Sequence, residues 1–343
     1  MKKENPLVSI IIVNWNGKQH IMECMDSIFK QTYRNFEVVL IDNGSTDGSQ
    51  KMVKEKFPKI KLVQNDANVG FTKANNIGLK ESSGEYVIFL NYDTAVDKNW
   101  MKELINSIEK KDTIGACQSK VLIYGTDLIN ADGIDVNFLG VSWCADYRKK
   151  FVEEIVDREI SCGTAASLMV RKDVLDLIGG FDDDYFMYHD DVDLSWRIRL
   201  AGYRIMLSPK SKVYHKYEFK RQTKSKFFNL ERNRQTTLLK NYGLKSLILA
   251  FPAFVITELC IYAYSVLSGS FIDKLKSNLY ILGNLGMILK KRSAIQKFRK
   301  ISDKEIIMSM KGGISFEEID NPLLRYVLNP FLEVYLKIMK LFY

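Results

Sequence analysis

Residues 86–94, YVIFLNYDT, form the stretch from which the rest of the chain is interpreted. Its apolar first half predicts a strand buried on both faces. In open α/β sheets, ligands bind beyond the carboxyl ends of strands, where Asp93 would stand. A carboxylate in that place can bind Mg²⁺ or Mn²⁺ beside a substrate phosphate. Alternatively, Asp93 caps a helix that begins near Lys98, because aspartate is a common N-cap.

Strands alternate with helices through the first part of the chain. Apolar runs predict strands at residues 7–13, 36–41 and 61–64, and helical spacing predicts a helix at residues 20–30. The alternation implies right-handed crossovers and a mostly parallel sheet. Polar clusters follow the strands, NWNG at 14–17 and DNGSTDGS at 42–49. These clusters mark the edge of the sheet where a nucleotide could bind.

Phosphate binding by a glycine loop is not indicated. The dinucleotide fingerprint G-x-G-x-x-G is missing after the first strand, where the sequence is NWNG, and there is no Walker A sequence. Phosphate would therefore be bound through a cation, which again points to Asp93.

Composition narrows the class of protein. The 343 residues suffice for a large domain plus an appendage, or for two domains. Five cysteines without a C-x-x-C pair favour a reducing compartment and argue against structural zinc, and the N-terminus shows no signal-peptide pattern. Residues 203–311 carry 22 Lys+Arg against 6 Asp+Glu, which is typical of a surface facing nucleic acid or anionic lipid. No nucleic-acid module accompanies the charge, so we do not expect nucleic acid as a partner.

A second informative stretch is GGFDDDYFMYHDDVDLSWR, residues 179–197. Asp190, Asp191 and Asp193 begin an expected amphipathic helix, whose dipole favours carboxylates in the first turn. That interpretation explains one or two of the acids, but it does not explain the aromatic turn YFMY before them. Carboxylates beside apolar rings are where desolvation can tune a general base.

Six motifs, taken in order, resemble glycosyltransferase family 2, in particular its rhamnosyltransferase-like members. They are VSIIIVNWNG, IDNGSTDGS, NVGFTKANNIG, NYDT, GGFDDDYFMYHDDVDLSWR and VYH, and the likeness covers roughly residues 7–245. The resemblance implies a GT-A fold, an α/β fold whose Rossmann-like mixed sheet has helices on both faces. Residues 1–245 would form this catalytic domain, and residues 246–343 would form a helical, membrane-associating extension.

The resemblance also implies roles for individual residues. Nucleotide-binding positions are Asn14, Asp42, Lys73, Asn76 and Asn91; metal-binding positions are Asp93 and His215; catalytic positions are Asp191, as the base, and Asp190; acceptor-side positions are Gly163 and Tyr188.

Two positions depart from the family pattern. Asn91 replaces the first acid of D-x-D and leaves one strong metal carboxylate, which suits Mg²⁺ that takes further ligands from water and the diphosphate. Asp190 stands where the family more often has glutamate, so its role stays open. His215 taken alone would more often be an ordinary surface or core histidine.

The expected reaction is sugar transfer, with inversion, from a nucleotide-diphosphate sugar to a lipid-linked or glycan acceptor. The resemblance suggests dTDP-rhamnose, with UDP- and GDP-sugars as alternatives. A second hypothesis is a non-catalytic scaffold with this fold in envelope polysaccharide assembly, although Asp42, Asp93 and Asp191 are all retained. A third is another Rossmann-like nucleotide enzyme, such as a nucleotidyltransferase or a dehydrogenase.

Residues 210–234 are basic, with Phe219, Phe227 and Phe228 interleaved. They predict either an acceptor-side lid or a solvated helix face. Residues 247–267 are apolar and long enough to cross a bilayer. Glu258 opposes a simple crossing, because an acid at the bilayer centre costs about 2.5–3.5 kcal/mol.

Basic residues on both flanks of residues 247–267 also conflict with the positive-inside rule. An interfacial or re-entrant helix fits better, and residues 323–343 have an amphipathic pattern as well. We therefore expect peripheral or monotopic attachment at the cytoplasmic face of the cell membrane. Alternatively, these helices cover one another or form a homodimer interface.

Overall fold

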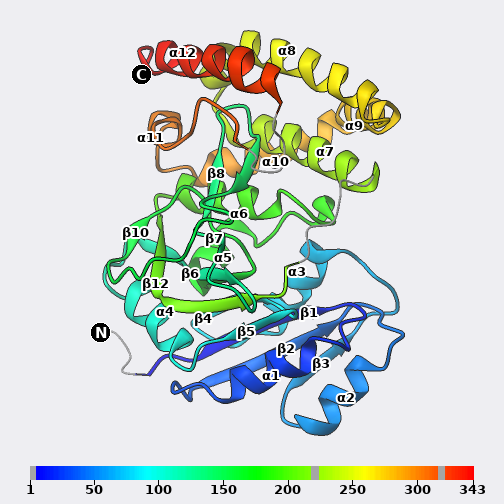
Figure 1. Ribbon diagram of the computed structural model, residues 1–343, viewed down its shortest axis with the longest axis vertical. Coiled ribbons are helices and arrows are strands. Elements are labelled where there is room, and N and C mark those ends of the chain that lie inside the picture. Colours follow the sequence, from blue (N-terminus) through cyan, green and yellow to red (C-terminus); the bar gives the residue numbers. More distant parts are fainter. Residues whose placement is uncertain (1–4, 218–223, 316–320) are drawn as a thin grey trace.

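The computed structural model describes residues 5–217, 224–315 and 321–343. A ten-stranded mixed sheet forms the lower part of the molecule, and a layer of helices lies above it (Figure 1). The strands of this sheet are β1 (Val8–Asn14), β2 (Phe36–Asp42), β3 (Lys61–Gln64), β4 (Tyr86–Asn91), β5 (Thr94–Val96), β6 (Ile114–Ile123), β7 (Ile129–Ala131), β10 (Arg158–Glu159), β11 (Ser167–Arg171) and β12 (Arg204–His215). A separate hairpin contains β8 (Ile134–Val136) and β9 (Ser142–Cys144).

The order of strands is β10-β12-β6-β11-β4-β1-β2-β3. The predicted strands at 7–13, 36–41, 61–64 and 86–90 are confirmed, and they form the parallel half of the sheet. The expectation of a mostly parallel sheet holds only for this half. β11 lies antiparallel between β4 and β6, so the whole sheet is mixed.

Helices cover both faces of the sheet. Buried side chains on alternate positions of β1, β2 and β4 contribute to two separate cores. The first core includes α1 (Ile21–Phe29), α2 (Ser49–Lys56) and α4 (Trp100–Ile108); the second includes α3 (Phe71–Glu81), α5 (Lys172–Ile178) and α6 (Asp190–Leu200). β4 is buried on both faces, as predicted.

The helix-cap interpretation of Asp93 is wrong. α4 begins at Trp100 and has Asn99 as its N-cap residue. Asp93 instead lies in the short turn between β4 and β5. Its carboxylate is therefore available for chemistry at the end of a buried strand.

The upper layer contains the helices α7 (Lys224–Asn241), α8 (Leu244–Leu267), α9 (Phe271–Gly283), α10 (Leu285–Phe298), α11 (Asp303–Met308) and α12 (Asn329–Lys340), with a π-helical turn at Leu324–Leu328 before α12. A third core joins this layer to the rest of the molecule. It contains Val136 from β8, Trp196 from α6 and Leu336 from α12. The region predicted to be helical is helical, and it shares this core with residues of the predicted catalytic domain.

One interpretation of the basic stretch 210–234 is a helix face exposed to solvent. For the described part of this stretch that lies in α7, that interpretation is wrong. Arg232 and Arg234 are both buried. Arg234 lies 2.8 Å from Glu231 and contacts Glu258 of α8. Phe227 is also buried, whereas Phe219 lies outside the described residues. Arg234 therefore serves internal ion pairs, and Arg232 donates to the backbone oxygen of Tyr185.

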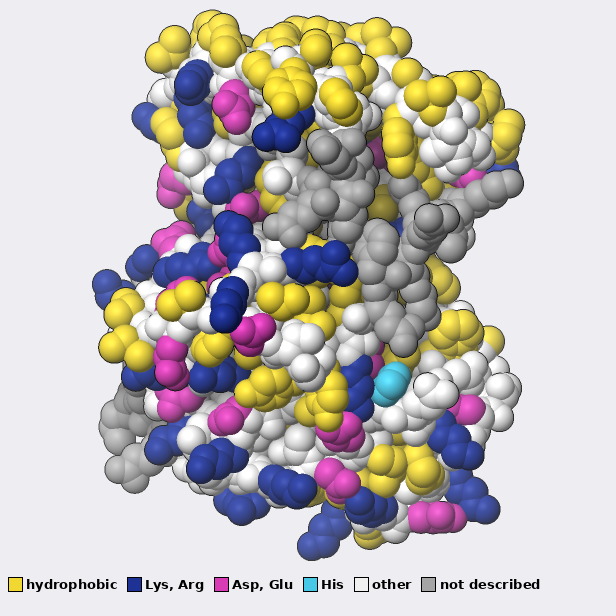
Figure 2. Space-filling view, in the orientation of Figure 1, with side chains coloured by type: hydrophobic (Ala, Val, Ile, Leu, Met, Phe, Trp, Pro, Cys, Tyr) yellow, Lys and Arg dark blue, Asp and Glu magenta, His cyan; other side chains and the backbone are white. Residues whose placement is uncertain are grey.

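α8 carries its large apolar side chains outward. Its buried positions are small or polar: Ser246, Ala250, Ala253, Thr257, Glu258 and Ser265. Its exposed positions include Leu244, Ile248, Phe251, Leu259 and Leu267. Leu247, Leu249 and Phe254 are partly buried against the third core, whereas a surface helix of a globular protein typically has polar side chains at its exposed positions. Figure 2 shows apolar side chains gathered over the top of the molecule, where α8 and α12 lie.

Within the described ranges, α8 is the one helix whose length and composition would allow it to cross a membrane. Glu258 lies within this helix but is not presented to the outside. Its carboxylate contacts Arg234 of α7 and lies 2.7 Å from Lys274 of α9. The acid that opposed a simple crossing is thus neutralised on the protein side of α8.

Candidate active site

The carboxyl ends of β1, β2 and β4 meet at one edge of the sheet. In the register of the sheet, Asn14 lies opposite Asp42, and Val13 lies opposite Asn91. Asn14 and Asp42 are buried, and Asn14 Nδ2 donates to Asp42 Oδ1 at 3.0 Å. Asp42 Oδ2 accepts the amide of Ser45 at 3.1 Å, which fixes the loop after β2. The structure therefore brings together Asn14, Asp42 and Asn91.

Asp93 and His215 form a pair at the same edge. His215 ends β12, which runs antiparallel to β5, and its Nε2 lies 3.2 Å from Asp93 Oδ1. Asn91 Nδ2 lies 3.4 Å from the same ring nitrogen. The other ring nitrogen, Nδ1, lies 2.8 Å from Oδ1 of Asn130. Because an amide oxygen only accepts, Nδ1 donates to Asn130, and Nε2 is the ring nitrogen directed at Asp93.

This donor set fits a divalent cation. A carboxylate oxygen and an imidazole nitrogen 3.2 Å apart can both act as ligands to Mg²⁺ or Mn²⁺. The described part of the chain contains no group of three or more His, Cys, Asp or Glu side chains placed to hold a metal. Two such protein ligands would leave coordination positions open for water or a diphosphate, which is the arrangement expected from the single carboxylate of NYDT.

Asp93 is held in its charged form. Burial alone would raise its pKa, but the hydrogen bond and charge of His215 outweigh burial, so the pKa of Asp93 lies below its ordinary value. Asn130 was not found by sequence reasoning. It belongs to no motif, and it reaches His215 through the pairing of β7 with β6.

Asp191 stands in the first turn of α6, beside a loop that precedes β11. Its Oδ1 accepts the amide of Ala165 at 3.0 Å, and its Oδ2 accepts the hydroxyl of Thr164 at 3.2 Å. Burial raises the pKa of Asp191 to about 6, and these two hydrogen bonds act in the opposite direction. A carboxyl with this pKa is ionised at neutral pH and basic enough to accept a proton.

The three acids of this turn have different environments. Burial and the neighbouring Asp191 raise the pKa of Asp190 well above its ordinary value. Asp193 is also buried, but it lies 2.8 Å from Arg197 and 2.9 Å from Lys240, which keep its pKa below the ordinary value. Asp193 is therefore a structural ion-pair partner, whereas Asp191 bonds the loop before β11.

Two hydrogen bonds connect the surroundings of Asp93 and Asp191. The backbone N–H of Asn91 donates to the backbone carbonyl of Ala166 at 3.3 Å. The backbone N–H of the neighbouring Ala165 donates to Oδ1 of Asp191. The loop before β11 therefore reaches both the end of β4 and the start of α6. This loop thus connects the strand that leads to Asp93 with the helix turn that carries Asp191.

Gly163 and Tyr188 flank Asp191. The amide of Gly163 donates to Ser195 Oγ at 3.0 Å, and a Cβ at this position would lie 2.7 Å from Leu168. Tyr188 is half-buried in the turn before α6. Thr164, next to Gly163, is a site residue that the sequence did not reveal, because a threonine in a loop has no distinguishing pattern.

Lys73 and Asn76 both lie on α3, where Lys73 is exposed. Asn76 Nδ2 donates to the oxygen of Phe181 at 2.9 Å, and Asn76 Oδ1 accepts the amide of the same residue at 2.9 Å. Nδ2 also lies 2.6 Å from Asp183. The contacts that the structure shows for Asn76 are thus structural, and they fix the segment that leads to α6.

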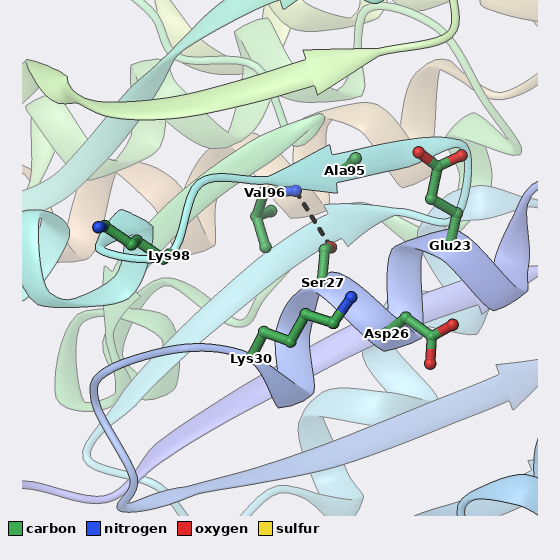
Figure 3. A pocket seen from close by; sticks show the side chains of 7 residues that line it. All are labelled: Glu23, Asp26, Ser27, Lys30, Ala95, Val96 and Lys98. Atoms are coloured by element: carbon green, nitrogen blue, oxygen red, sulfur yellow. Dashed lines mark hydrogen bonds between the residues drawn. The ribbon is translucent and has the colours of Figure 1, made fainter.

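A pocket of about 400 Å³ lies beside α1 and β5 (Figure 3). It is lined by Glu23, Asp26, Ser27, Lys30, Ala95, Val96 and Lys98. None of these is a predicted site residue. Asp93 and Asp191 are not among the residues that line this pocket.

Comparison with known proteins agrees with this arrangement. The model for the family described as glycosyl transferase family 2 matches residues 9–179, which include the ends of β1, β2 and β4. The chain belongs to glycosyl transferase family 2. The resemblance drawn from the six motifs is confirmed.

Relatives in the family include bacterial glycosyltransferases. An uncharacterized glycosyltransferase of Haemophilus influenzae is 38% identical over 117 residues, 33% of this chain and 36% of that protein. This chain thus matches about a third of the length of that relative. The N-acetylglucosaminyl-diphospho-decaprenol L-rhamnosyltransferase of Mycobacterium tuberculosis is 26% identical over 233 residues, 61% of this chain and 76% of that protein.

Among solved structures, GalNAc-T7 with UDP, GalNAc and Mn²⁺ has a TM-score of 0.61 at 18% identity, covering 81% of this chain and 55% of that chain. At such low identity the likeness shows the fold alone. It confirms the predicted GT-A-like arrangement, a mixed sheet with helices on both faces.

Proposed function

We propose that this family 2 member is an inverting, metal-dependent glycosyltransferase that moves a sugar from a nucleotide diphosphate to an acceptor hydroxyl. One observation carries the proposal: Asp93 and His215 form a metal-compatible pair just after β4, and the loop that bonds the backbone of Asn91 in β4 also bonds the desolvated carboxyl of Asp191. Asp42, Asp93 and Asp191, which a non-catalytic scaffold could lose, are all present.

The chemistry follows from these positions. Asp191, with its raised pKa, removes the proton of the acceptor hydroxyl, and that oxygen forms a bond to the anomeric carbon. The bond from the anomeric carbon to the diphosphate breaks, with inversion, through an oxocarbenium-like transition state. Asp191 is thus the base of the reaction, and burial keeps its pKa high.

Asp93 and His215 would hold the divalent cation. When bound, Mg²⁺ or Mn²⁺ supplies positive charge next to the leaving diphosphate. Asn14 and Asp42 fix the loop after β2 on the nucleoside side, and Gly163 and Tyr188 would border the acceptor.

The donor we would examine first is dTDP-rhamnose. Its support is the likeness to the mycobacterial rhamnosyltransferase, whose name also indicates a diphospho-decaprenol-linked acceptor. The test is donor turnover by the full chain across dTDP-, UDP- and GDP-sugars, with Mn²⁺, with Mg²⁺ and with a chelator. We expect metal-dependent release of a nucleoside diphosphate from one donor class. No turnover, combined with no metal-dependent thermal stabilisation by any nucleotide, would contradict the proposal.

We further propose that α8, α9 and α12 rest on the cytoplasmic face of an anionic membrane. The support is the outward apolar face of α8, continued by exposed Leu282 on α9 and Ile338 on α12. Lys245 and Lys337 are exposed on α8 and α12 and would contact lipid head groups. Inward-facing Glu258 removes the main electrostatic objection to this placement.

Flotation with vesicles of phosphatidylglycerol and phosphatidylcholine tests this attachment. Replacing Ile248 and Leu259 by glutamate, at side chains 64% and 65% exposed, should abolish flotation. Each buried aliphatic side chain contributes on the order of 1.5–3 kcal/mol to such binding. Val152→Glu, at a position 69% exposed in the catalytic part, is the matched control and should float. A wild-type protein that does not float but forms dimers would favour a homodimer interface instead.

A further inference from the structure

The residues before α6 form a strained turn. Phe186, Tyr188 and His189 have φ values of 59°, 69° and 61°, a region that residues with a side chain rarely adopt. Such conformations persist only where the surroundings over-determine them. Asp190 and Asp191 follow directly, so the path of this turn sets the position of the proposed base.

Asn233, on α7, holds three backbone carbonyls of this turn. Its Nδ2 lies 3.1 Å from the oxygen of Tyr185, 3.0 Å from that of Met187 and 2.7 Å from that of Tyr188. The side chain is completely buried. One amide group therefore ties three successive parts of the turn to a single point on α7.

Two further residues complete the support. Arg232 donates from Nε to Asn233 Oδ1 at 2.9 Å and from Nη2 to the oxygen of Tyr185 at 2.8 Å, which orients the amide of Asn233. From the other side, the amide of Phe71 at the start of α3 donates to the oxygen of Phe186 at 2.6 Å. Every carbonyl from residue 185 to residue 188 is thus bonded to another segment.

α7 is itself anchored on the side away from the turn. The next two residues, Arg234 and Gln235, both bond the carboxylate of Glu258 on α8. Gln235 also donates to Asn278 on α9 at 2.8 Å. Figure 1 shows α7 between α6 and α8. Consecutive side chains of one helix therefore connect the turn before the base to the outer helices.

We propose that Asn233 is a positioning residue of the transfer reaction: it fixes the strained turn and thereby aims Asp191 at the acceptor hydroxyl. This inference rests on the proposed function, since it takes Asp191 as the base. Asn233 acts through the backbone of the turn, and it leaves the binding of the nucleotide to the ends of β1, β2 and β4. Its loss should therefore lower the rate of the chemical step without changing affinity for the donor.

The test compares Asn233→Ala with Gln235→Ala. The control removes a buried amide two positions along α7, but one that bonds α8 and α9 instead of the turn. For Asn233→Ala we expect kcat to fall by about 10²-fold, the effect of a misplacement on the order of 1 Å, with KM for the donor unchanged. The acidic limb of its pH–rate profile should move to lower pH, because a loosened Asp191 regains water. Gln235→Ala should keep the wild-type kcat and pH profile.

A merely structural role predicts a different result. Asn233→Ala would then melt at a lower temperature but show wild-type kcat and pH profile below its melting temperature, which would overturn the inference. Equal losses of kcat in both variants would overturn it as well. If Asn233→Ala does not fold, the Arg232→Lys variant is measured instead. This substitution removes the planar guanidinium that orients the amide of Asn233, but it keeps the positive charge. A wild-type kcat in the Arg232→Lys variant would refute the inference. Wild-type protein inactive with every donor would instead refute the proposed function.

Discussion

Asp191→Asn tests whether the proposed base destabilises the fold that carries it. Burial raises the pKa of Asp191 from 3.8 to about 6. A difference of that size corresponds to about 3 kcal/mol of unfolding free energy. This is an upper bound, because Asp191 keeps part of its surface in solvent, so we expect a gain of ~1–3 kcal/mol on replacing it by a neutral amide. The amide oxygen can still accept the N–H of Ala165.

The sign depends on pH. Above about pH 6, the carboxyl is ionised in both the folded and the unfolded state, and the folded state bears the full cost of its desolvation. Below about pH 3.8, it is protonated in both states, and the cost is absent. The stability of the wild type therefore falls as pH rises through this window, and the advantage of Asp191→Asn grows over the same window.

Urea denaturation of both proteins at pH 4 and pH 8 measures this difference, and turnover at pH 8 measures the loss of the base. We expect turnover to drop by at least about 10²–10⁴-fold, the usual contribution of a general base. Asp193→Asn, in the same turn, is the control of opposite sign. It should lower stability at pH 8, because buried Arg197 and Lys240 lose their counter-charge. An Asp191→Asn protein less stable than wild type at pH 8, or one that keeps turnover, would refute the reasoning.

Three more predictions concern the rest of the site. Asp93→Asn should abolish the Mn²⁺-dependent part of thermal stabilisation by nucleotides, because His215 alone is a weak site; an undiminished shift in a thermal melt would contradict this. Thr164→Val removes a hydrogen bond that lowers the pKa of Asp191, so the pKa of Asp191 should rise. The acidic limb of the pH profile of kcat should therefore move to higher pH. Gly70→Ala should cost ~1–3 kcal/mol in urea denaturation and reduce kcat, because Gly70 has φ +90° and its Cβ would lie 2.7 Å from the oxygen of Phe186. A Gly70→Ala protein with unchanged stability would be inconsistent with the strained turn.

Local sequence was sufficient for the parallel half of the sheet and for the acids at its edge. A buried strand has a continuous apolar run, and the polar residue that ends it is visible without knowing its neighbours, as with Asp93 after β4. The antiparallel insertion of β11 could not be found in this way. A run such as SLMVR is compatible with either strand direction, and its place between β4 and β6 depends on pairings distant in sequence.

The same limit applies to polar residues that act through a partner. Asn130 reaches His215, and Asn233 reaches the turn at residues 185–188, only through tertiary contacts. The basic stretch containing Arg234 was open to a solvated interpretation, because a sequence does not show which charges are paired in the interior. Asn76 belongs to a family motif, yet both ends of its amide bond the backbone of Phe181.

The ion pairs of Glu258 limit how α8 can lie relative to a membrane, more than the amino-acid composition of the helix does. Its carboxylate is shared by Arg234 and Lys274, so moving α8 alone into a bilayer would separate buried charges from their partners. Breaking a buried pair of this kind costs about 3–5 kcal/mol. The exposed apolar side chains of α8, by contrast, lose contact with water favourably on entering lipid. Both energies favour α8 lying along a membrane surface with α7 beneath it, where α7 can still hold the turn before Asp191.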